Sequence, residues 1–237
     1  MKKATIILSV IILSAILGSC IFTGSIKGNG NIIEETRDLD DFSKISVSRG
    51  MNVYIIQGTS TKVTVKADEN LLKVIDTYVD DNTLKVTTTK GIRNASSNKV
   101  YVTVTDLEFI KSTSGSNVFS EDSLTTKNLE IRGTAGSNVR LSLEAGELTI
   151  SASAGSNIFL EGKAKSVTMK ASSGSNIKAG DLQTENCDAK VSSGANIWIK
   201  VQNGLTAKAS SGGNLFYSGD PNPLSVTKSS GGNIIKN

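Results

Sequence analysis

The residues that could carry out catalysis are few and poorly arranged. The 237 residues contain no histidine, which removes the commonest general acid/base and the commonest metal ligand of enzymes. Without histidine, no Ser/His or Cys/His nucleophile pair can form. The acidic residues of the C-terminal half are scattered, whereas a glycosidase needs two converging carboxylates about 5–9.5 Å apart. The sequence therefore predicts a protein without catalytic activity.

Two acidic runs are the remaining candidates for metal ligands. Asp38, Asp40 and Asp41 form one run, and Asp80 and Asp81 form the other. A calcium site requires several clustered oxygen ligands, whereas both runs have the composition of turns. We therefore expect no metal site and no cofactor. A polysaccharide lyase or hydrolase built on a β-helix is the weakest functional alternative.

The N-terminus carries the pattern of a lipoprotein signal. Two lysines precede an apolar run over residues 4–17, which ends in Leu17-Gly18-Ser19-Cys20. A basic segment, a short apolar segment and small residues before a cleavage point describe a secretory signal. The run is shorter than the roughly 20 residues that span a bilayer. Leu-Gly-Ser-Cys resembles the bacterial lipobox, so we expect a signal peptide over residues 1–19, acylation of Cys20 and a lipidated tether over residues 20–29.

An acylated Cys20 would anchor the protein to the cell envelope, because each buried methylene contributes about 0.8 kcal/mol. Bacterial lipoproteins retained in the inner membrane often carry Asp after the acylated cysteine, and Ile21 stands there in this chain. The resemblance therefore favours the outer membrane. Cys187 is the only other cysteine, so no intramolecular disulfide is expected. We predict that Cys187 is a buried, inert thiol.

A tetrapeptide recurs through the second half of the chain. It begins as Gly115-Ser116-Asn117-Val118 and ends as Gly231-Gly232-Asn233-Ile234. Its asparagines are 21, 19, 19, 20, 18 and 19 residues apart, and a fixed period near 20 residues indicates a solenoid. The repeat asparagines are Asn117, Asn138, Asn157, Asn176, Asn196, Asn214 and Asn233.

The residues around each asparagine predict two strands and a corner. Apolar residues recur nine and seven places before the asparagine, and one and three places after it. This alternation is typical of strands with one buried face, and the glycine allows a sharp turn between them. Coils stacked at about 4.8 Å would align the apolar columns. The asparagines would then form a ladder in which each amide bonds to the next coil.

The N-terminal half is less regular. Asn31 and Asn52 follow glycines in a similar context and are also 21 residues apart, which suggests coils that start early. We expect irregular N-terminal coils over residues 30–105, with hairpins that cap the solenoid as terminal repeats must. Regular repeats are expected over residues 106–237. The two parts form one all-β solenoid domain with coils of about 18–21 residues.

Two outward columns form the candidate binding face. The basic column, six places before the asparagines, either keeps the sheet soluble or attracts acidic polysaccharide or lipid headgroups. The aromatic column, two places after them, packs on itself through cation–π contacts, forms an oligomer interface or stacks on sugar rings. The candidate residues are Phe119, Arg140, Phe159, Lys178, Trp198 and Phe216 in the aromatic column and Lys170, Lys190 and Lys208 in the basic column.

The repeats resemble a known family. Together with the segments 36–39, 53–58 and 67–72, they are similar to the "GIN" head domain of putative auto-transporter adhesins, which are exported bacterial proteins. The resemblance covers residues 28–237. It implies a right-handed parallel β-helix on a lipoprotein or exported protein and marks no active site.

The net charge and the predicted export limit the classes of partner that the protein could bind. A net charge of +4 without dense Lys/Arg clusters argues against nucleic acid as a partner. We expect a non-catalytic envelope lipoprotein that contacts the membrane through its lipid. Its repetitive face would serve adhesion, with a glycan or an envelope protein as the partner. The alternative is a structural or regulatory lipoprotein whose face associates with another copy in a homo-oligomer.

Overall fold

The computed structural model describes residues 24–237, so the predicted signal peptide and Cys20 lie outside the described residues. In this part of the chain, no helix is long and apolar enough to cross a membrane. The only helical element described is the 3₁₀ turn η1 at Glu69–Leu71. The strands are β1 (Ile26–Lys27), β2 (Ile32–Arg37), β3 (Lys44–Val47), β4 (Asn52–Gln57), β5 (Lys62–Asp68), β6 (Ile75–Asp80), β7 (Thr83–Thr88), β8 (Ile92–Arg93), β9 (Asn98–Val104), β10 (Phe109–Ser112), β11 (Asn117–Ser120), β12 (Leu124–Gly133), β13 (Asn138–Ala152), β14 (Asn157–Ala171), β15 (Asn176–Val191), β16 (Asn196–Ala209), β17 (Asn214–Ser218), β18 (Leu224–Lys228) and β19 (Asn233–Lys236).

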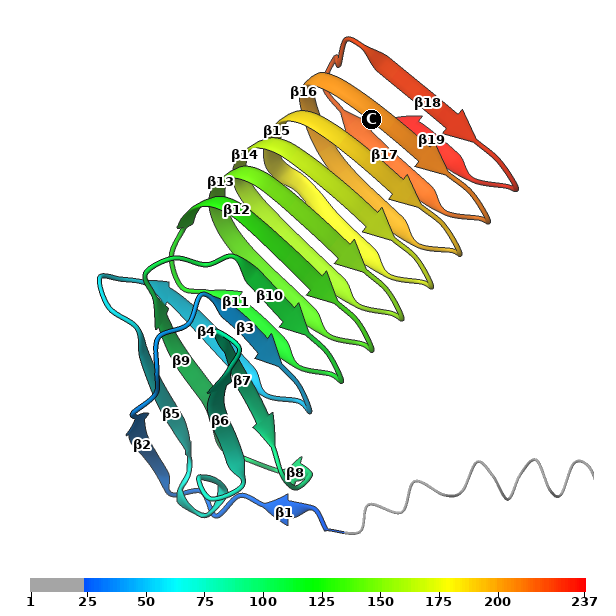
Figure 1. The fold of residues 1–237 in the computed structure, drawn as a ribbon. Helices are drawn as coiled ribbons and strands as arrows, with labels where there is room; N and C mark the ends of the chain where they lie inside the picture. The colour runs from blue at the N-terminus through cyan, green and yellow to red at the C-terminus, as the bar shows by residue number, and fades with distance from the viewer. Residues whose placement is uncertain (1–23) are drawn as a thin grey trace, which may run out of the picture.

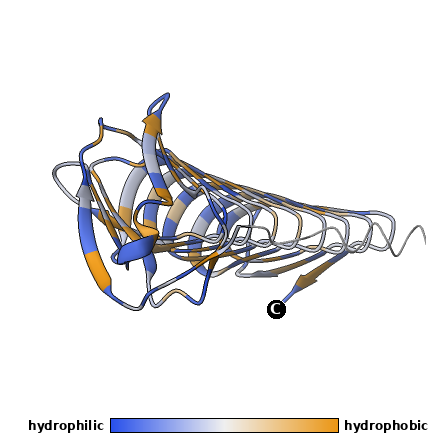
Figure 2. Cartoon of the chain, turned by 90° about the horizontal axis from the view of Figure 1, so that it is seen from below, coloured by the Kyte–Doolittle hydropathy of each residue, from blue (hydrophilic) through white to orange (hydrophobic). Residues whose placement is uncertain are grey.

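The chain from β10 onward is a parallel β-solenoid, which confirms the predicted fold class. Two facing layers of strands meet at a row of tight turns (Figures 1 and 2). The strands β13 to β16 each run from one tight turn almost to the next, and each pairs in parallel with its successor. The pairing keeps the sequence repeat in register, so that Asn138 lies beside Asn157 and Ile150 lies beside Met169. The columns read from the sequence are therefore the columns of the sheets.

The core is a continuous channel between the two layers. Polar and apolar residues alternate along the strands (Figure 2), and the apolar ones point inward. Ile131, Ile150 and Met169 stack in one such column and are fully buried. Among the described residues, no coil lies beyond β18 and β19. There Leu224 and Val226 are 45% and 42% exposed, although they occupy columns that are buried in the preceding coils.

The spatial order of the first coils differs from their order in the chain. In one layer β7 pairs with β3, and β3 pairs with β10; in the other, β9 pairs with β4, and β4 pairs with β11. All four pairings are parallel. The coil that contains β7 and β9 is thus the outermost, and the earlier segment β3–β4 lies between it and β10–β11.

An antiparallel cap closes the N-terminal end. β5 pairs antiparallel with both β9 and β2, and β6 pairs antiparallel with β7. The cap covers the end of the channel beside β7 and β9 (Figure 1). This agrees with hairpins that cap irregular coils.

The suggestion that the coils start at Asn31 is wrong. Asn31 precedes the edge strand β2, which runs antiparallel to β5 and does not belong to a coil. Its side-chain amide donates to the carboxylate of Glu69 at 2.9 Å. The Gly-x-Asn context at this point serves a local turn beside η1, because no parallel neighbour is available there to continue the ladder.

Candidate functional site

Each coil turns at two consecutive residues with left-handed backbone. At the first regular corner, Ser114 has a φ of 53° and Gly115 a φ of 70°. The backbone N–H of Ser116 donates to the carbonyl oxygen of Thr113 at 3.2 Å. Two positive φ values closed by this hydrogen bond define a type I′ turn. The pair recurs at Ala135–Gly136, Ala154–Gly155, Ser173–Gly174, Ser193–Gly194, Ser211–Gly212 and Ser230–Gly231.

The asparagine side chains that follow these turns are joined across the coils. The Nδ2 of Asn138 donates to the Oδ1 of Asn117 at 2.9 Å, and Asn157 donates in the same way to Asn138 at 3.1 Å. Later donors act in the same direction at 2.9, 2.9, 3.0 and 3.0 Å; they are Asn176, Asn196, Asn214 and Asn233. Each interior amide thus donates one hydrogen bond and accepts one within the ladder, which indicates a structural role for this column.

The ladder extends further toward the N-terminus than the regular repeats. Asn117 donates to Asn52 at 2.8 Å, and Asn52 donates to Asn98. The amide of Asn98 ends the series on the carbonyl oxygen of Gly50 at 3.1 Å. The Gly-x-Asn context indicated Asn52, whereas no glycine precedes Asn98 and no sequence signal identified it.

A column of buried serines, not recognised from the sequence, lies directly before the asparagines. The Oγ of Ser156 donates to the carbonyl oxygen of Gly133 in the preceding coil at 2.9 Å and accepts the backbone N–H of Ser153 at 3.1 Å. Each hydroxyl therefore ties its own corner to the coil before it. The recurrence of serine before asparagine was the available signal. The fully buried members are Ser116, Ser137, Ser156 and Ser175.

The aromatic column forms a chain of stacked rings and cations on one outer face. Arg140 lies over the Phe159 ring, with its guanidinium carbon 4.9 Å from the ring centroid. The Lys178 nitrogen lies 5.1 Å from the Phe159 centroid and 5.7 Å from that of Trp198. The rings of Trp198 and Phe216 are stacked at 5.3 Å with an interplanar angle of 11°. The rings are half-buried, so they pack on one another and keep part of each surface open.

Two tyrosines extend this column to the capped end. Tyr54 stacks between Phe119 at 5.1 Å and Tyr101 at 5.3 Å. Lys99 lies over the Tyr54 ring at 5.1 Å. Tyr54 stands two places after Asn52, so the repeat could have identified it. Tyr101 joins through the β4–β9 pairing, which the repeat does not encode.

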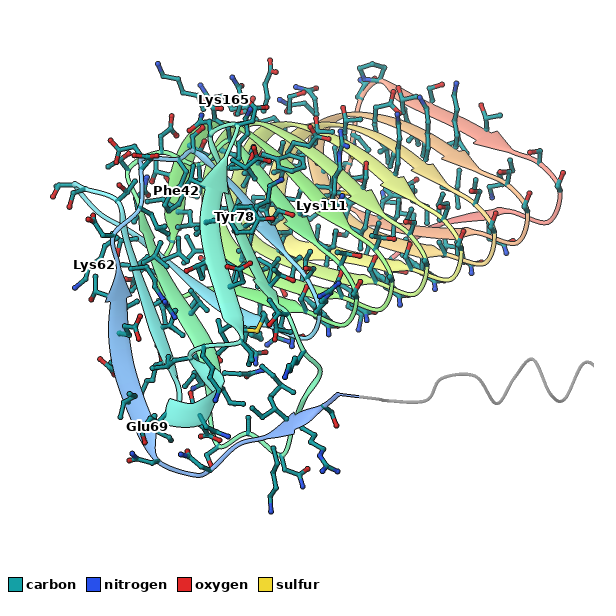
Figure 3. All side chains as sticks on the ribbon, turned by 60° about the horizontal axis from the view of Figure 1, so that its bottom comes forward. Phe42, Lys62, Glu69, Tyr78, Lys111 and Lys165 are labelled. Atoms are coloured by element: carbon teal, nitrogen blue, oxygen red, sulfur yellow. The ribbon has the colours of Figure 1, made fainter. Side chains whose placement is uncertain are left out.

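The basic column lines an open groove in the other layer. Lys170, Lys190 and Lys208 are adjacent in register across β14, β15 and β16. Together with serines four places before the asparagines, they surround a hollow of about 570 Å³. These serines are Ser153, Ser172, Ser192, Ser210 and Ser229. Figure 3 shows side chains projecting from both layers, with Lys111 of the same column on β10.

The carboxylates form no metal cluster in the described residues, although Glu161 and Asp181 are register partners that line one hollow together with Arg140. Across residues 24–237, no group of three or more His, Cys, Asp or Glu residues could hold a metal ion. Cys187 is buried, as predicted, and burial raises the pKa of its thiol to about 12, with a smaller contribution from Asp188. A protonated, buried thiol is a poor nucleophile.

Comparison with known proteins places the fold in a family. The family described as "Putative auto-transporter adhesin, head GIN domain" matches residues 41–221. The chain belongs to this family. A solved putative adhesin from Bacteroides fragilis is 26% identical to this GIN domain, covers 90% of this chain and 100% of its own, and has a TM-score of 0.82.

Other solved structures share the fold of the GIN domain. A putative adhesin from Parabacteroides merdae is 18% identical over 91% of this chain and 100% of its own, with a TM-score of 0.73. A putative lipid binding protein from Parabacteroides distasonis is 20% identical over 90% of this chain and 99% of its own, with a TM-score of 0.69. No curated protein matches the chain.

The outward features of this GIN domain lie on opposite sides of its core. The lysine groove belongs to strand segments that precede the corner, whereas the aromatic column belongs to segments that follow it. These segments form the two facing layers (Figure 1). The GIN domain thus presents two chemically different outer surfaces, one aromatic and cationic and one basic and hydroxylated.

Proposed function

We propose that this GIN domain is a non-catalytic adhesion module of the cell envelope, anchored through an acylated Cys20. Membership of an adhesin family supports the adhesive role, and the Leu17-Gly18-Ser19-Cys20 motif supports the anchor. The lack of histidine supports the absence of catalysis. Its partner would be a glycan or an envelope protein bound on the outer face of the solenoid.

The observation that carries this proposal is the stacked aromatic column. Aromatic and arginine side chains are the groups that most often anchor a binding partner. In this column each ring is already held by its neighbours, as Phe159 is held by Arg140 and Lys178. Little rotamer entropy would be lost on binding, which favours affinity. Open ring faces and edges would suit sugar rings or an apolar protein surface.

Exposure on the cell is the first test of the adhesive role. Protease added to intact cells should digest the protein, because an adhesin must be reachable from outside. Lysed cells provide the control that the protein is cleavable. A protein that survives on intact cells and is digested after lysis would contradict the adhesin proposal.

Loss of binding after ring removal is the second test. The purified protein and its Phe159→Ala/Trp198→Ala variant would be compared on a glycan array and on envelope protein extracts. We expect partner binding to weaken about tenfold or more, because each ring acts as an anchor. Tyr78→Ala is the matched control, since Tyr78 is an exposed aromatic outside the column. Equal binding by all three proteins would exclude the column as the binding surface.

A structural, self-associating role is the second candidate function. It is favoured by the uncovered C-terminal end, where Leu224, Val226 and Ile235 are exposed and β18 and β19 each lack an outer neighbour among the described strands. Light scattering would show a concentration-dependent dimer or larger species. If Leu224→Ser/Val226→Ser abolished this species while Phe159→Ala/Trp198→Ala still bound every ligand normally, self-association would replace adhesion as the function.

A further inference from the structure

The lysine groove concentrates positive charge without local compensation. Lys170 pairs in register with Lys190, and Lys190 pairs with Lys208, at the strand spacing of about 4.8 Å. Like charges on directly opposed strand positions destabilise a sheet. The groove therefore keeps an arrangement that is unfavourable unless an anion lies along it.

Acidic side chains are nearly absent around these lysines. Among the described residues, Lys190 has one weak ion pair, with Asp188 at 3.8 Å, and neither Lys170 nor Lys208 has any. The neighbouring outward position of the adjacent coils holds Thr168 and Thr206, which are register partners of Asp188. An anionic ligand would thus meet cations and hydroxyls, with a single competing carboxylate.

The opposite rim of the groove offers hydroxyls in the same repeat. Ser172, Ser192 and Ser210 line it, and within residues 24–237 no hydrogen bond engages their side-chain oxygens. The floor consists of backbone, because the side chains of Ala171 and Ala209 belong to the core and are 3% and 2% exposed. Each of the three coils that contain β14, β15 and β16 therefore contributes one cation and one free hydroxyl to a channel parallel to the solenoid axis.

We propose that this groove binds a single chain of an anionic polysaccharide, laid along the solenoid axis with its carboxylate or sulfate groups on Lys170, Lys190 and Lys208. The sugar hydroxyls would bond to the serine rim. This inference rests on the proposed adhesive function and assigns a ligand class to the face opposite the aromatic column. A polymer that carries an acidic group on each sugar can offer one anion after another to the lysines of successive coils.

A polysaccharide fits the groove better than a membrane surface does. Proteins that lie on bilayers insert projecting apolar side chains beside their basic residues. None of the groove-lining residues is an exposed large apolar side chain, and Val191 in the floor is 3% exposed. A flat headgroup layer would reach the lysines but not the recessed serines.

The test is calorimetric titration of the full chain, in detergent micelles, with polygalacturonate. We expect binding that weakens as salt is added, because exposed ion pairs are screened, and no heat with neutral dextran. The variant Lys170→Gln/Lys190→Gln/Lys208→Gln should bind about tenfold more weakly or worse. The corresponding triple arginine variant should retain binding, since it keeps the charges.

A charge-matched control separates the groove from the overall charge. Lys127, Lys163 and Lys165 lie beside a different hollow, so changing all three to Gln removes the same charge elsewhere. This variant should lose less than about threefold. Equal losses in the two Gln variants would overturn the proposal, as would the absence of any heat from the unaltered chain.

Two outcomes distinguish the groove from the alternatives. The membrane alternative is tested with phosphatidylcholine vesicles that contain or lack phosphatidylglycerol. If the triple Gln variant of the groove lysines lost only the stronger binding to vesicles with phosphatidylglycerol, the lysines would contact a membrane and the proposal would be wrong. If polygalacturonate did not bind while Phe159→Ala/Trp198→Ala abolished partner binding, the groove proposal would fail and the adhesive function would stand. If the protein were protected from protease on intact cells and still bound polygalacturonate, the groove proposal would stand and the adhesive function would fail.

Discussion

Asn117 donates its side-chain amide to the side-chain oxygen of Asn52, 65 residues earlier in the chain, at 2.8 Å. This bond joins the regular repeats to a segment that the chain left long before. Between the two asparagines lie the β7–β9 coil and most of the antiparallel cap. The ladder therefore follows spatial order, and it links the capped end to the repeats.

Removal of an interior ladder asparagine should destabilise the solenoid. Asn176→Ala leaves the amide of Asn196 without an acceptor and the oxygen of Asn157 without a donor. An unsatisfied, partly buried polar group costs about 1–3 kcal/mol, so we expect the free energy of unfolding in urea to fall by that order. Asn233→Ala should have a smaller effect, because Asn233 has one ladder neighbour. Equal, negligible changes in both variants would show that the ladder contributes nothing.

The buried serine column provides a reciprocal pair of substitutions. Ser156→Ala removes the hydrogen bond to Gly133 and leaves the N–H of Ser153 with one partner fewer, so stability should fall by about 1 kcal/mol. Ala195 is fully buried at the equivalent position, and Ala195→Ser should supply the missing bond and raise the melting temperature. If both variants melted at the unaltered temperature, the column would be only a consequence of close packing.

The corner glycines should be sensitive to substitution for backbone reasons alone. Gly155 has a φ of 71°, and a methyl group there would meet no atom within 4 Å. Gly155→Ala should therefore cost about 1–2 kcal/mol through left-handed strain without a clash. Ala154 has a φ of 48°, and Ala154→Asn should stabilise the turn, because Asn tolerates this conformation. Chemical denaturation that ranked the two variants in the opposite order would contradict the type I′ assignment.

Cys187 should make stability depend on alkaline pH. Because burial raises the pKa of the thiol from 9.0 to about 12, the folded protein binds its proton more tightly than the unfolded chain. Its contribution to stability is fully present below pH 9 and declines as the pH rises toward 12. Cys187→Ala should lose this part of the alkaline decline in denaturation curves.

The reactivity of the same thiol provides an independent check. At pH 8 a thiol reagent should label native protein far more slowly than protein in urea, because the thiolate is the reactive form. Cys187→Ala gives the background. Native labelling as fast as unfolded labelling would mean that Cys187 is accessible, contrary to its burial.

The regular half of the fold could be predicted because successive coils pair through equivalent positions of the sequence repeat. The positions counted from Asn138 and Asn157 are the ones that pair in the sheet, so apolar columns read from the sequence became the core. The aromatic column followed from the same count. The structure adds the continuous stacking of Phe159, Lys178 and Trp198, which depends on side-chain orientation that spacing alone does not determine.

The order of the first coils could not be predicted in this way. β4 pairs with β9 on one edge and with β11 on the other, and nothing local to β4 determines which strand takes which edge. Asn31 had the same local pattern as Asn52 but has no parallel neighbour. The lysine groove was recognised as a charged stripe, whereas the hollow of about 570 Å³ between the lysines and the serines depends on how these side chains project, which spacing alone does not determine.

The ladder has a direction, and its two ends differ. From Asn52 to Asn233 each amide nitrogen points toward the cap, and in the described chain no partner takes the oxygen of Asn233. Antiparallel strands cap the N-terminal end of the solenoid. At the other end, an additional coil could pair with β18 and β19 and continue the ladder from Asn233. Gain or loss of a whole repeat between β13 and β16 would leave both termini unchanged. The length of the solenoid can therefore change in steps of one coil without any change in the residues that form its two ends.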